Sequence, residues 1–304
     1  MRIIWTLVLF VLVSAALFSC QKSNGDIPMP AIIDSPYLDR YIELDTLYTS
    51  GLDTLFKSKF SYDAQKRIVQ KTETAYDYGT GNVVFNANEY CQYTGSDTVP
   101  YRVIRKESYT IGQVLDDTLY LFYDANNIIT KDSVISYTNG ARTGKKRITY
   151  APNGTGKFIV IITAFQPNNN TVLSRDSIRS NRSIAAGNLT NSSDSSYHVP
   201  GGLFEVYQYN YNHDTKISPS GHINLHYPVF IPGVHYTLYN YLPDTRSINN
   251  PTTFSMLHWY NGNTSNSTGE LKYTYNSNGR PSIIRPTSSG GSTPLKTLLF
   301  YRTL

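Results

Sequence analysis

The sequence has little cysteine and little glutamate. Its 304 residues include two cysteines and six glutamates. Because Cys20 closes an apolar N-terminal segment, Cys91 would have no intrachain partner in an exported chain. A lone cysteine in an alternating stretch such as NEYCQYTG is usually a small buried apolar residue. No intrachain disulfide is therefore expected, and a hydrophobic core has to stabilise the protein.

Helical periodicity and the common catalytic motifs are also missing after the first twenty residues. The stretch GARTGKKR, residues 140–147, has one residue too few between its glycines for a phosphate-binding loop. Lys146 stands where such a loop has Ser or Thr, and no Gly-x-Ser-x-Gly elbow occurs. The sequence therefore predicts no catalytic residue and no cofactor.

Paired carboxylates are the remaining route to an enzyme. Asp116 and Asp117 are adjacent, so on a strand they would point to opposite faces, whereas a glycosidase needs two acids that face each other. A pair assembled from distant strands, such as Glu205 with Glu270, is left open.

The longest apolar run is at the N-terminus. Residues 1–19 place Arg2 before an apolar segment slightly shorter than the ~17–25 residues of a spanning helix, which predicts a signal peptide. The ending LFSC, residues 17–20, looks like a bacterial lipobox and predicts lipidation of Cys20; the alternative is a plain signal peptide that ends in cysteine. Residues 20–36 would then be the lipidated cysteine and a flexible tether. We expect an outer-membrane lipoprotein, exposed at the cell surface or in the periplasm, with membrane lipid as a partner.

One hairpin formula recurs in residues 37–304. Five stretches share the same order of residues. An aromatic residue is followed in most of them by Asp or Asn, then by two turn residues and by a strand with β-branched residues. Their shared tyrosines are Tyr62, Tyr123, Tyr150, Tyr211 and Tyr275. Asn278-Gly279 favours positive φ at both central positions of a type I′ turn. The prediction is one all-β domain, a curved antiparallel sheet of successive hairpins (a meander) with about twelve to sixteen strands, partly closed or sandwich-like. Irregular loops are expected at 166–202 and 212–269, and residues around 203–270 are expected to form an irregular excursion packed on the same sheet.

The lipobox, the hairpin formula and the stretch YTYNSNGRP, residues 273–281, together resemble a group of Bacteroidota lipoproteins with degenerate tyrosine–aspartate repeats, distantly like those of Rhs shells. The resemblance covers about residues 37–304. It implies a location and an architecture, and it brings no catalytic residues. The third copy departs from it, with Ala151 at the acidic position.

Aromatic residues are the most abundant candidates for ligand binding. The stretch YQYNY places three tyrosines on one face of a strand, and a second aromatic pair precedes a polar loop. These candidates are Tyr207, Tyr209, Tyr211, Trp259 and Tyr260. Aromatic faces beside amide groups suit sugar rings, and the alternative is a cross-strand aromatic ladder that stiffens the sheet.

Metal and polyanion binding are the weaker hypotheses. His222 and His226 would lie ~13 Å apart on a strand, too far to share a zinc ion, so no metal is predicted. The cluster Arg142, Lys145, Lys146 and Arg147 could meet phosphates, although lysines of this kind more often keep a strand edge soluble. No nucleic acid partner is expected, since the net charge of +5 is spread along the chain.

The sequence therefore favours a non-catalytic lipoprotein that binds a glycan or another envelope component. The alternative is an exported hydrolase of polysaccharide or peptide.

Overall fold

The computed structural model describes residues 37–45, 53–77, 80–125, 129–152, 157–186, 188–198, 201–218, 248–288 and 295–304. Residues 1–36, which hold the predicted signal peptide, Cys20 and the tether, lie outside the described residues. The described residues form sixteen strands: β1 (Tyr37–Asp45), β2 (Asp53–Tyr62), β3 (Ile68–Tyr76), β4 (Val83–Gln92), β5 (Arg102–Tyr109), β6 (Val114–Tyr123), β7 (Ile129–Thr138), β8 (Ala141–Pro152), β9 (Lys157–Phe165), β10 (Val172–Ala185), β11 (Asn188–His198), β12 (Leu203–Ile217), β13 (Asn249–Tyr260), β14 (Asn263–Tyr275), β15 (Pro281–Ser288) and β16 (Leu295–Arg302).

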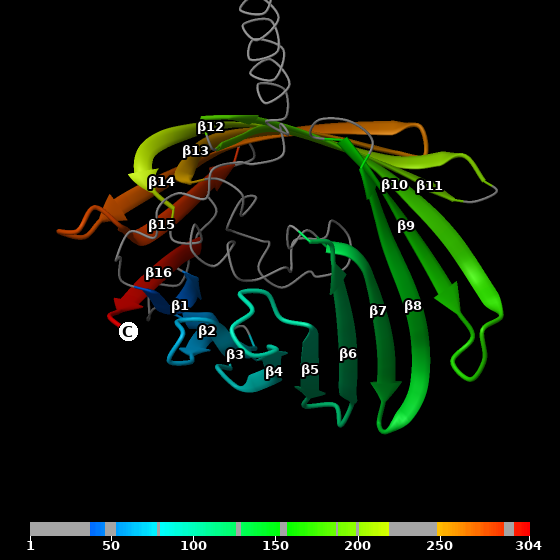
Figure 1. Cartoon of the computed structure of the whole chain (residues 1–304). Coiled ribbons are helices and arrows are strands. Elements are labelled where there is room, and N and C mark those ends of the chain that lie inside the picture. The colour runs from blue at the N-terminus through cyan, green and yellow to red at the C-terminus, as the bar shows by residue number, and fades with distance from the viewer. Residues whose placement is uncertain are drawn as a thin grey trace, which may run out of the picture. The chain divides into compact units, whose positions relative to one another are not determined.

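These strands form one closed antiparallel barrel (Figure 1). Each strand pairs with its neighbours in sequence, and β1 pairs with β16 to complete the ring. The all-β meander is confirmed, and the sheet is neither open nor a sandwich. Closure leaves no strand at a sheet edge. Among the described residues there is no apolar helix of membrane-spanning length.

The predicted irregular loops are wrong where the structure describes them. Residues 172–185 and 188–198 form β10 and β11, and most of 203–270 belongs to β12, β13 and β14. These strands were hard to recognise because Ser, Thr and Asn fill many of their positions, and such residues usually mark turns. Residues 219–247 lie outside the described residues.

Two copies of the hairpin formula build the same turn. In the β2–β3 turn, Asp63 Oδ1 accepts hydrogen bonds from the backbone N–H groups of Gln65 and Arg67, both at 2.9 Å. In the β14–β15 turn, Asn276 Oδ1 accepts the corresponding two bonds, both at 3.0 Å. The Asp or Asn of the formula therefore starts the turn, as its side-chain chemistry predicts.

The predicted turn type at Asn278-Gly279 is wrong. Of these two residues only Gly279 has a positive φ, of 72°. A β-bulge lies next to the turn, between Thr274 and Tyr275 on β14. This is the three-residue hairpin in which a left-handed residue makes a bulge. Type I′ geometry, with positive φ at both positions, occurs instead at Asn139-Gly140 and Asn261-Gly262.

Two of the formula's tyrosines, Tyr62 and Tyr123, belong to a set whose hydroxyl groups link strand ends, whereas Tyr150 and Tyr275 donate to the side chains of Asp132 and Asp214. Near the end of an even-numbered strand, a tyrosine hydroxyl donates to a backbone carbonyl at or near the start of the strand before it. The bonds run from Tyr62 to Leu38, Tyr93 to Ile68, Tyr123 to Pro100, Tyr273 to Pro251 and Tyr301 to Pro281, at 2.7–2.9 Å. We call these five residues the tyrosine rim, since all of them stand at one end of the barrel. Tyr211, from the fourth copy, instead lies within β12, so that copy makes no turn.

An apolar core lines the inner face of β1 to β7 and β14 to β16. Its largest buried side chains include Phe60, Ile68 and Leu119, each 2% exposed or less. Cys91 lies in the same core and is buried, as predicted.

The outer wall is mostly polar. Strand alternation puts the core residues inward and their neighbours outward. The outward residues include Lys57 and Lys59 on β2, Thr72 and Thr74 on β3, Asn86 and Asn88 on β4, Ser193 and Ser195 on β11, and Asn210 and Asn212 on β12.

Candidate functional site

An aromatic stripe runs along the inner face of β12. The rings of Tyr207 and Tyr209 are stacked with centroids 6.3 Å apart, and those of Tyr209 and Tyr211 are 5.9 Å apart, with interplanar angles of 11° and 7°. His258, opposite Tyr207 on β13, stacks on that tyrosine at 4.2 Å with an angle of 2°. We call these four residues the aromatic stripe. Its rings are half-buried, so part of each ring stays accessible.

Short polar side chains flank the aromatic stripe on both sides. The register places Ser192 and Asp194 of β11 beside Tyr209 and Tyr207. On the other side, Ser265 and Ser267 of β14 lie opposite His258 and Met256. The inner wall thus offers a row of ring faces between two rows of hydroxyl and carboxylate groups, and most of these groups are hydrogen-bonding acceptors as well as donors.

The sequence candidates divide between the two faces of the wall. The three tyrosines of β12 share one face, as predicted, and this face is the inner one. Tyr260, 48% exposed, lies on the same side next to His258. Trp259 points to the outer face, because adjacent residues of a strand alternate. Trp259 and Tyr260 therefore cannot act on one ligand together. His258 was missed by sequence reasoning; its position two residues before Tyr260 was the available signal.

A carboxylate holds the ring of His258 in place. His258 Nε2 lies 2.9 Å from Glu205 Oε1, and Glu205 stands two residues before Tyr207 on the same face. The stacked, hydrogen-bonded imidazole extends the platform by one ring. Glu205 is thus engaged with a histidine. Glu270, the partner that the sequence left open, points outward on β14, so the two do not form a facing acid pair.

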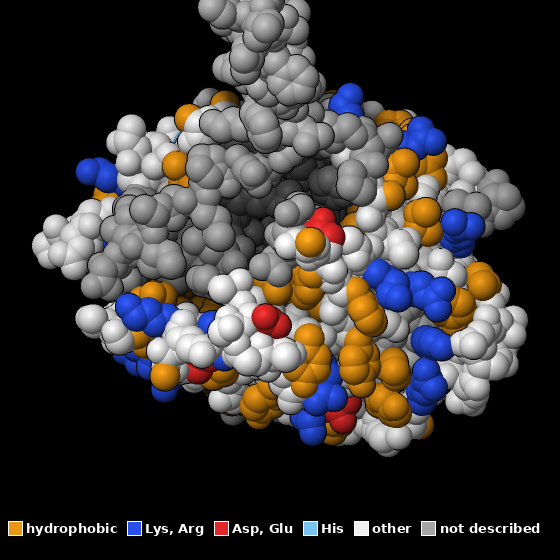
Figure 2. All heavy atoms as spheres, in the orientation of Figure 1, with side chains coloured by type: hydrophobic (Ala, Val, Ile, Leu, Met, Phe, Trp, Pro, Cys, Tyr) orange, Lys and Arg blue, Asp and Glu red, His pale blue; other side chains and the backbone are white. Residues whose placement is uncertain are grey.

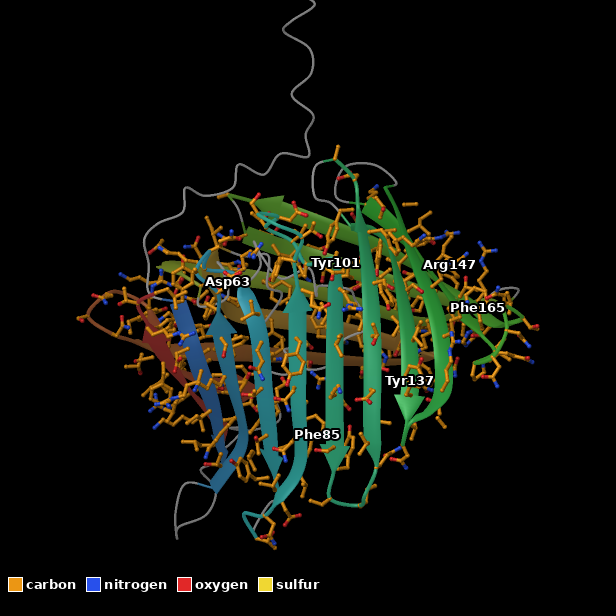
Figure 3. All side chains as sticks on the ribbon, turned by 60° about the horizontal axis from the view of Figure 1, so that its bottom comes forward. Asp63, Phe85, Tyr101, Tyr137, Arg147 and Phe165 are labelled. Carbon is orange, nitrogen blue, oxygen red and sulfur yellow. The ribbon has the colours of Figure 1, made fainter. Side chains whose placement is uncertain are left out.

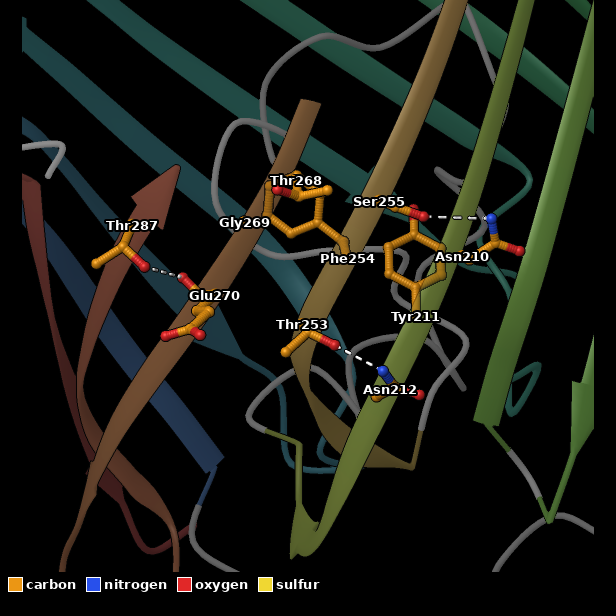
Figure 4. A pocket seen from close by; sticks show the side chains of 10 residues that line it. All are labelled: Asn210, Tyr211, Asn212, Thr253, Phe254, Ser255, Thr268, Gly269, Glu270 and Thr287. Carbon is orange, nitrogen blue, oxygen red and sulfur yellow. Dashed lines mark hydrogen bonds between the residues drawn. The ribbon is translucent and has the colours of Figure 1, made fainter. Parts of the chain in front are cut away.

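A hollow of about 530 Å³ lies in the wall formed by β12 to β15 (Figure 4). Most of its lining side chains are outward-facing amides and hydroxyls. Asn212 Nδ2 donates to Thr253 Oγ1 at 2.7 Å, and Asn210 Nδ2 donates to Ser255 Oγ at 3.3 Å. The inward ring of Phe254 covers Gly269, where a Cβ would come within 2.4 Å of that ring. Glycine is therefore needed there to let the ring lie flat against the strand.

A second polar group, the buried charge cluster, lies inside β3, β4 and β5. Arg105 Nη1 lies 2.8 Å from Glu73 Oε2 and 3.3 Å from Glu89 Oε2, and its Nε lies 2.5 Å from Glu107 Oε1. Lys71 forms an ion pair with Glu73, and both side chains are 1% exposed. The carboxylates of this cluster are engaged by cations. Sequence reasoning missed it because charges at alternate positions normally mark the outer face of a strand.

Burial raises the pKa values of carboxyl groups in this interior. The pKa of Glu43 on β1 rises to about 7, because burial disfavours the charged form and because Glu73 adds negative charge. The pKa of Asp132 on β7 rises to about 6 through burial, partly offset by the hydrogen bond from Tyr150 at 2.7 Å.

Metal binding has no support in the described part of the chain. No group of three His, Cys, Asp or Glu side chains with metal-binding geometry occurs there. The weak candidates His222 and His226 fall within 219–247, outside the described residues. The absence of a metal at that pair stays a prediction.

The sequence matches no protein-family model and no curated protein. Among solved structures, the chain is similar to a porin-like protein from Bacteroides vulgatus ATCC 8482, with a TM-score of 0.51 and 12% identity, over 89% of this chain and 100% of that one. It is also similar to a porin-like protein from Bacteroides uniformis ATCC 8492, with a TM-score of 0.47 and 11% identity, over 87% of this chain and 98% of that one. At this identity, the first similarity establishes the fold alone. The chain thus shares the barrel fold of a porin-like protein from Bacteroides.

Proposed function

We propose that this protein is a non-catalytic binding protein of the bacterial envelope and that its aromatic stripe holds a glycan chain. The single observation that carries the proposal is the row of stacked rings at 5.9–6.3 Å spacing between rows of short polar side chains. A sugar ring presents C–H groups on its faces and hydroxyls on its edge, so it can stack on tyrosine while bonding to neighbouring hydroxyls.

The outer wall supports a tethered barrel over one embedded in lipid. Strands that span an outer membrane alternate apolar residues outward and polar residues inward. Here the outward positions of β2 carry Lys57 and Lys59, and a lysine facing lipid at the bilayer midplane would cost ~2–4 kcal/mol. An anchor at Cys20 followed by a flexible tether would hold such a water-facing barrel at the membrane.

The charge cluster supports binding over hydrolysis. A hydrolytic acid or base needs a carboxyl group free to exchange a proton with substrate. Glu73, Glu89 and Glu107 each contact Arg105 instead. The cluster therefore acts as a structural brace in the wall, and the alternative of an exported hydrolase has no assigned residue among the described ones.

The test of glycan binding is titration calorimetry of the purified protein with neutral hexasaccharides of glucan, mannan, galactan and xylan. We expect binding of at least one of them and loss of about tenfold or more in affinity for Tyr207→Ser/Tyr209→Ser, since stacking is worth ~1 kcal/mol or more per ring. The matched control is Tyr90→Ser, because Tyr90 is 39% exposed and points outward on β4. If no glycan binds, or if both variants lose affinity equally, the stripe is only a structural ladder.

The anchor is tested separately by labelling cells with a fatty-acid analogue. The wild type should take up label and sediment with membranes, whereas Cys20→Ala should do neither while keeping the same thermal unfolding temperature. An unlabelled wild-type protein found free in the periplasm or the medium would refute the anchor and leave the glycan proposal standing.

A further inference from the structure

The outer wall of β7 to β10 carries positive charge without outward negative charge among its described residues. We call six of the outward cations of this wall the basic face. They are Lys131 on β7, Lys145 and Arg147 on β8, Lys157 on β9, and Arg175 and Arg179 on β10. Figure 2 shows Lys and Arg side chains gathered beside hydrophobic ones on this side of the molecule. The carboxylates Asp132 and Asp176 of the same strands point inward.

Protection of a sheet edge does not explain these charges. Lysines on an edge strand deter pairing with another chain. In the closed barrel, β8 is paired with β7 on one side and with β9 on the other, so Lys145 and Arg147 guard no edge. The sequence also suggested one cluster containing Lys146, but that side chain points inward between its neighbours. The other cations lie on β7 to β10, and the pairing of these strands brings them close together.

Aromatic side chains hold several cations of the basic face against the wall. Lys145 and Arg147 both lie over the ring of Phe165, each 5.5 Å from its centroid, and Figure 3 shows Arg147 and Phe165 close together on β8 and β9. Lys131 lies 4.2 Å over Phe122 on β6. Phe165 is only 8% exposed, since its two cations cover it. These contacts restrict the side chains and present their charges in a defined pattern.

The register sets the spacing of this pattern. Arg147 of β8 lies opposite Thr163 of β9, and Arg175 of β10 lies opposite the same threonine from the other side. Two strand spacings separate the backbones of the two arginines, about 9–10 Å. Along β8, Lys145 and Arg147 are about 7 Å apart. Lys131, Lys145, Arg147 and Arg175 thus form a group in which each backbone position lies within about 10 Å of another, and Arg179, with Lys157 beside it, lies about 13 Å from Arg175 along β10.

We propose that the basic face binds a flexible acidic polysaccharide through its uronate carboxylates. The planar guanidinium groups of Arg147, Arg175 and Arg179 match carboxylates in a bidentate geometry. A polymer with carboxylates along its length can follow the curve of the wall and meet several cations at once. A flat anionic membrane would touch the convex wall along few strands, and rings covered by cations, such as Phe165, are not available to insert into lipid.

The experiment measures binding of polygalacturonate oligomers to the full purified protein at 50 mM salt. Fully methyl-esterified oligomers of the same length are the neutral ligand control. We expect binding of the acidic form alone, and weakening of about tenfold or more for Arg147→Gln/Arg175→Gln, since each removed charge acts at close range. Salt at 0.5 M should abolish binding, because it screens exposed charges.

The matched control variant is Lys57→Gln/Lys59→Gln, which removes the same net charge from outward positions of β2. It should weaken binding less than twofold. Equal loss in the two variants would overturn the proposal, because only overall charge would then matter. Binding to vesicles of phosphatidylcholine and phosphatidylglycerol without binding to polygalacturonate would also overturn it, in favour of a membrane surface. The stripe variant Tyr207→Ser/Tyr209→Ser should leave this binding unchanged, which separates it from the proposed glycan site.

Discussion

Replacing Glu43 by glutamine should make the protein more stable at neutral and alkaline pH. Glu43 lies on β1 between Phe56 of β2 and Thr297 of β16, and its pKa rises from 4.5 to about 7 through burial and then through the charge of Glu73. The folded protein therefore holds a proton on this group more tightly than the unfolded chain does. Because the folded-state pKa is the higher one, folding costs free energy once the group must ionise.

The magnitude follows from the two pKa values. The pKa of Glu43 is 4.5 in the unfolded chain and about 7 in the folded protein. At ~1.4 kcal/mol for each pKa unit, this difference corresponds to about 3 kcal/mol. Below pH 4.5 the group is protonated in both states and costs nothing. The free energy of unfolding then falls as pH rises from 4.5 to about 7 and stays level above that. Asp132 contributes in the same direction with its pKa of about 6, so the comparison has to be between variants and not between pH values alone.

Urea unfolding of the wild type and Glu43→Gln at pH 4, 6 and 8 measures this effect. The variant should gain about 3 kcal/mol over the wild type between pH 4 and pH 8, with the gain appearing mainly between pH 4.5 and 7. Glu270→Gln is the control, because this side chain is exposed on β14 and its replacement should change stability by less than about 0.5 kcal/mol at any pH. A wild type and a Glu43→Gln variant that differ by the same amount at pH 4 and pH 8 would refute the reasoning.

Three further substitutions test the wall of the barrel. Arg105→Leu leaves three carboxylates without their shared cation and should cost about 3–5 kcal/mol at pH 8 by urea unfolding; a loss below about 1 kcal/mol would contradict the electrostatic reading. Tyr62→Phe removes the hydrogen bond to the Leu38 carbonyl and should lower the free energy of unfolding by about 1 kcal/mol, and unchanged stability would mean that water replaces the hydroxyl. Gly269→Ala brings a methyl group onto the ring of Phe254 and should cost about 1–3 kcal/mol, seen as a lower thermal unfolding temperature, whereas a neutral effect would show that the ring can move.

The local parts of the fold could be predicted from the sequence. Asp63 and Asn276 start turns because of their own side-chain chemistry, and the tyrosines before them mark strand ends. The same formula failed at Tyr211, since nothing within ten residues distinguishes a strand end from a strand middle when both are rich in Asn and Tyr. Closure could not be predicted either, because the pairing of β1 with β16 joins residues more than two hundred positions apart and has no local signal.

The candidate site was predictable in part for a similar reason. Alternation placed Tyr207, Tyr209 and Tyr211 on one face from the sequence alone. It could not say that this face is the inner one, because both faces of β12 carry polar or aromatic residues. The stacking of His258 on Tyr207 depends on the register between β12 and β13, which has no local signal in the sequence.

The pairing of the first strand with the last has a consequence for how the chain is made. As the polypeptide emerges from a ribosome or a translocation channel, β1 appears first, and β2 covers one of its sides soon afterwards. Its other side has to wait for residues 295–302, so the nascent chain carries an exposed row of backbone donors and acceptors throughout synthesis. Such an edge recruits other strands, which makes the incomplete protein prone to aggregation and a natural client of chaperones. A stop codon anywhere before β16 would leave that edge open permanently, so the cell should degrade even a nearly full-length product.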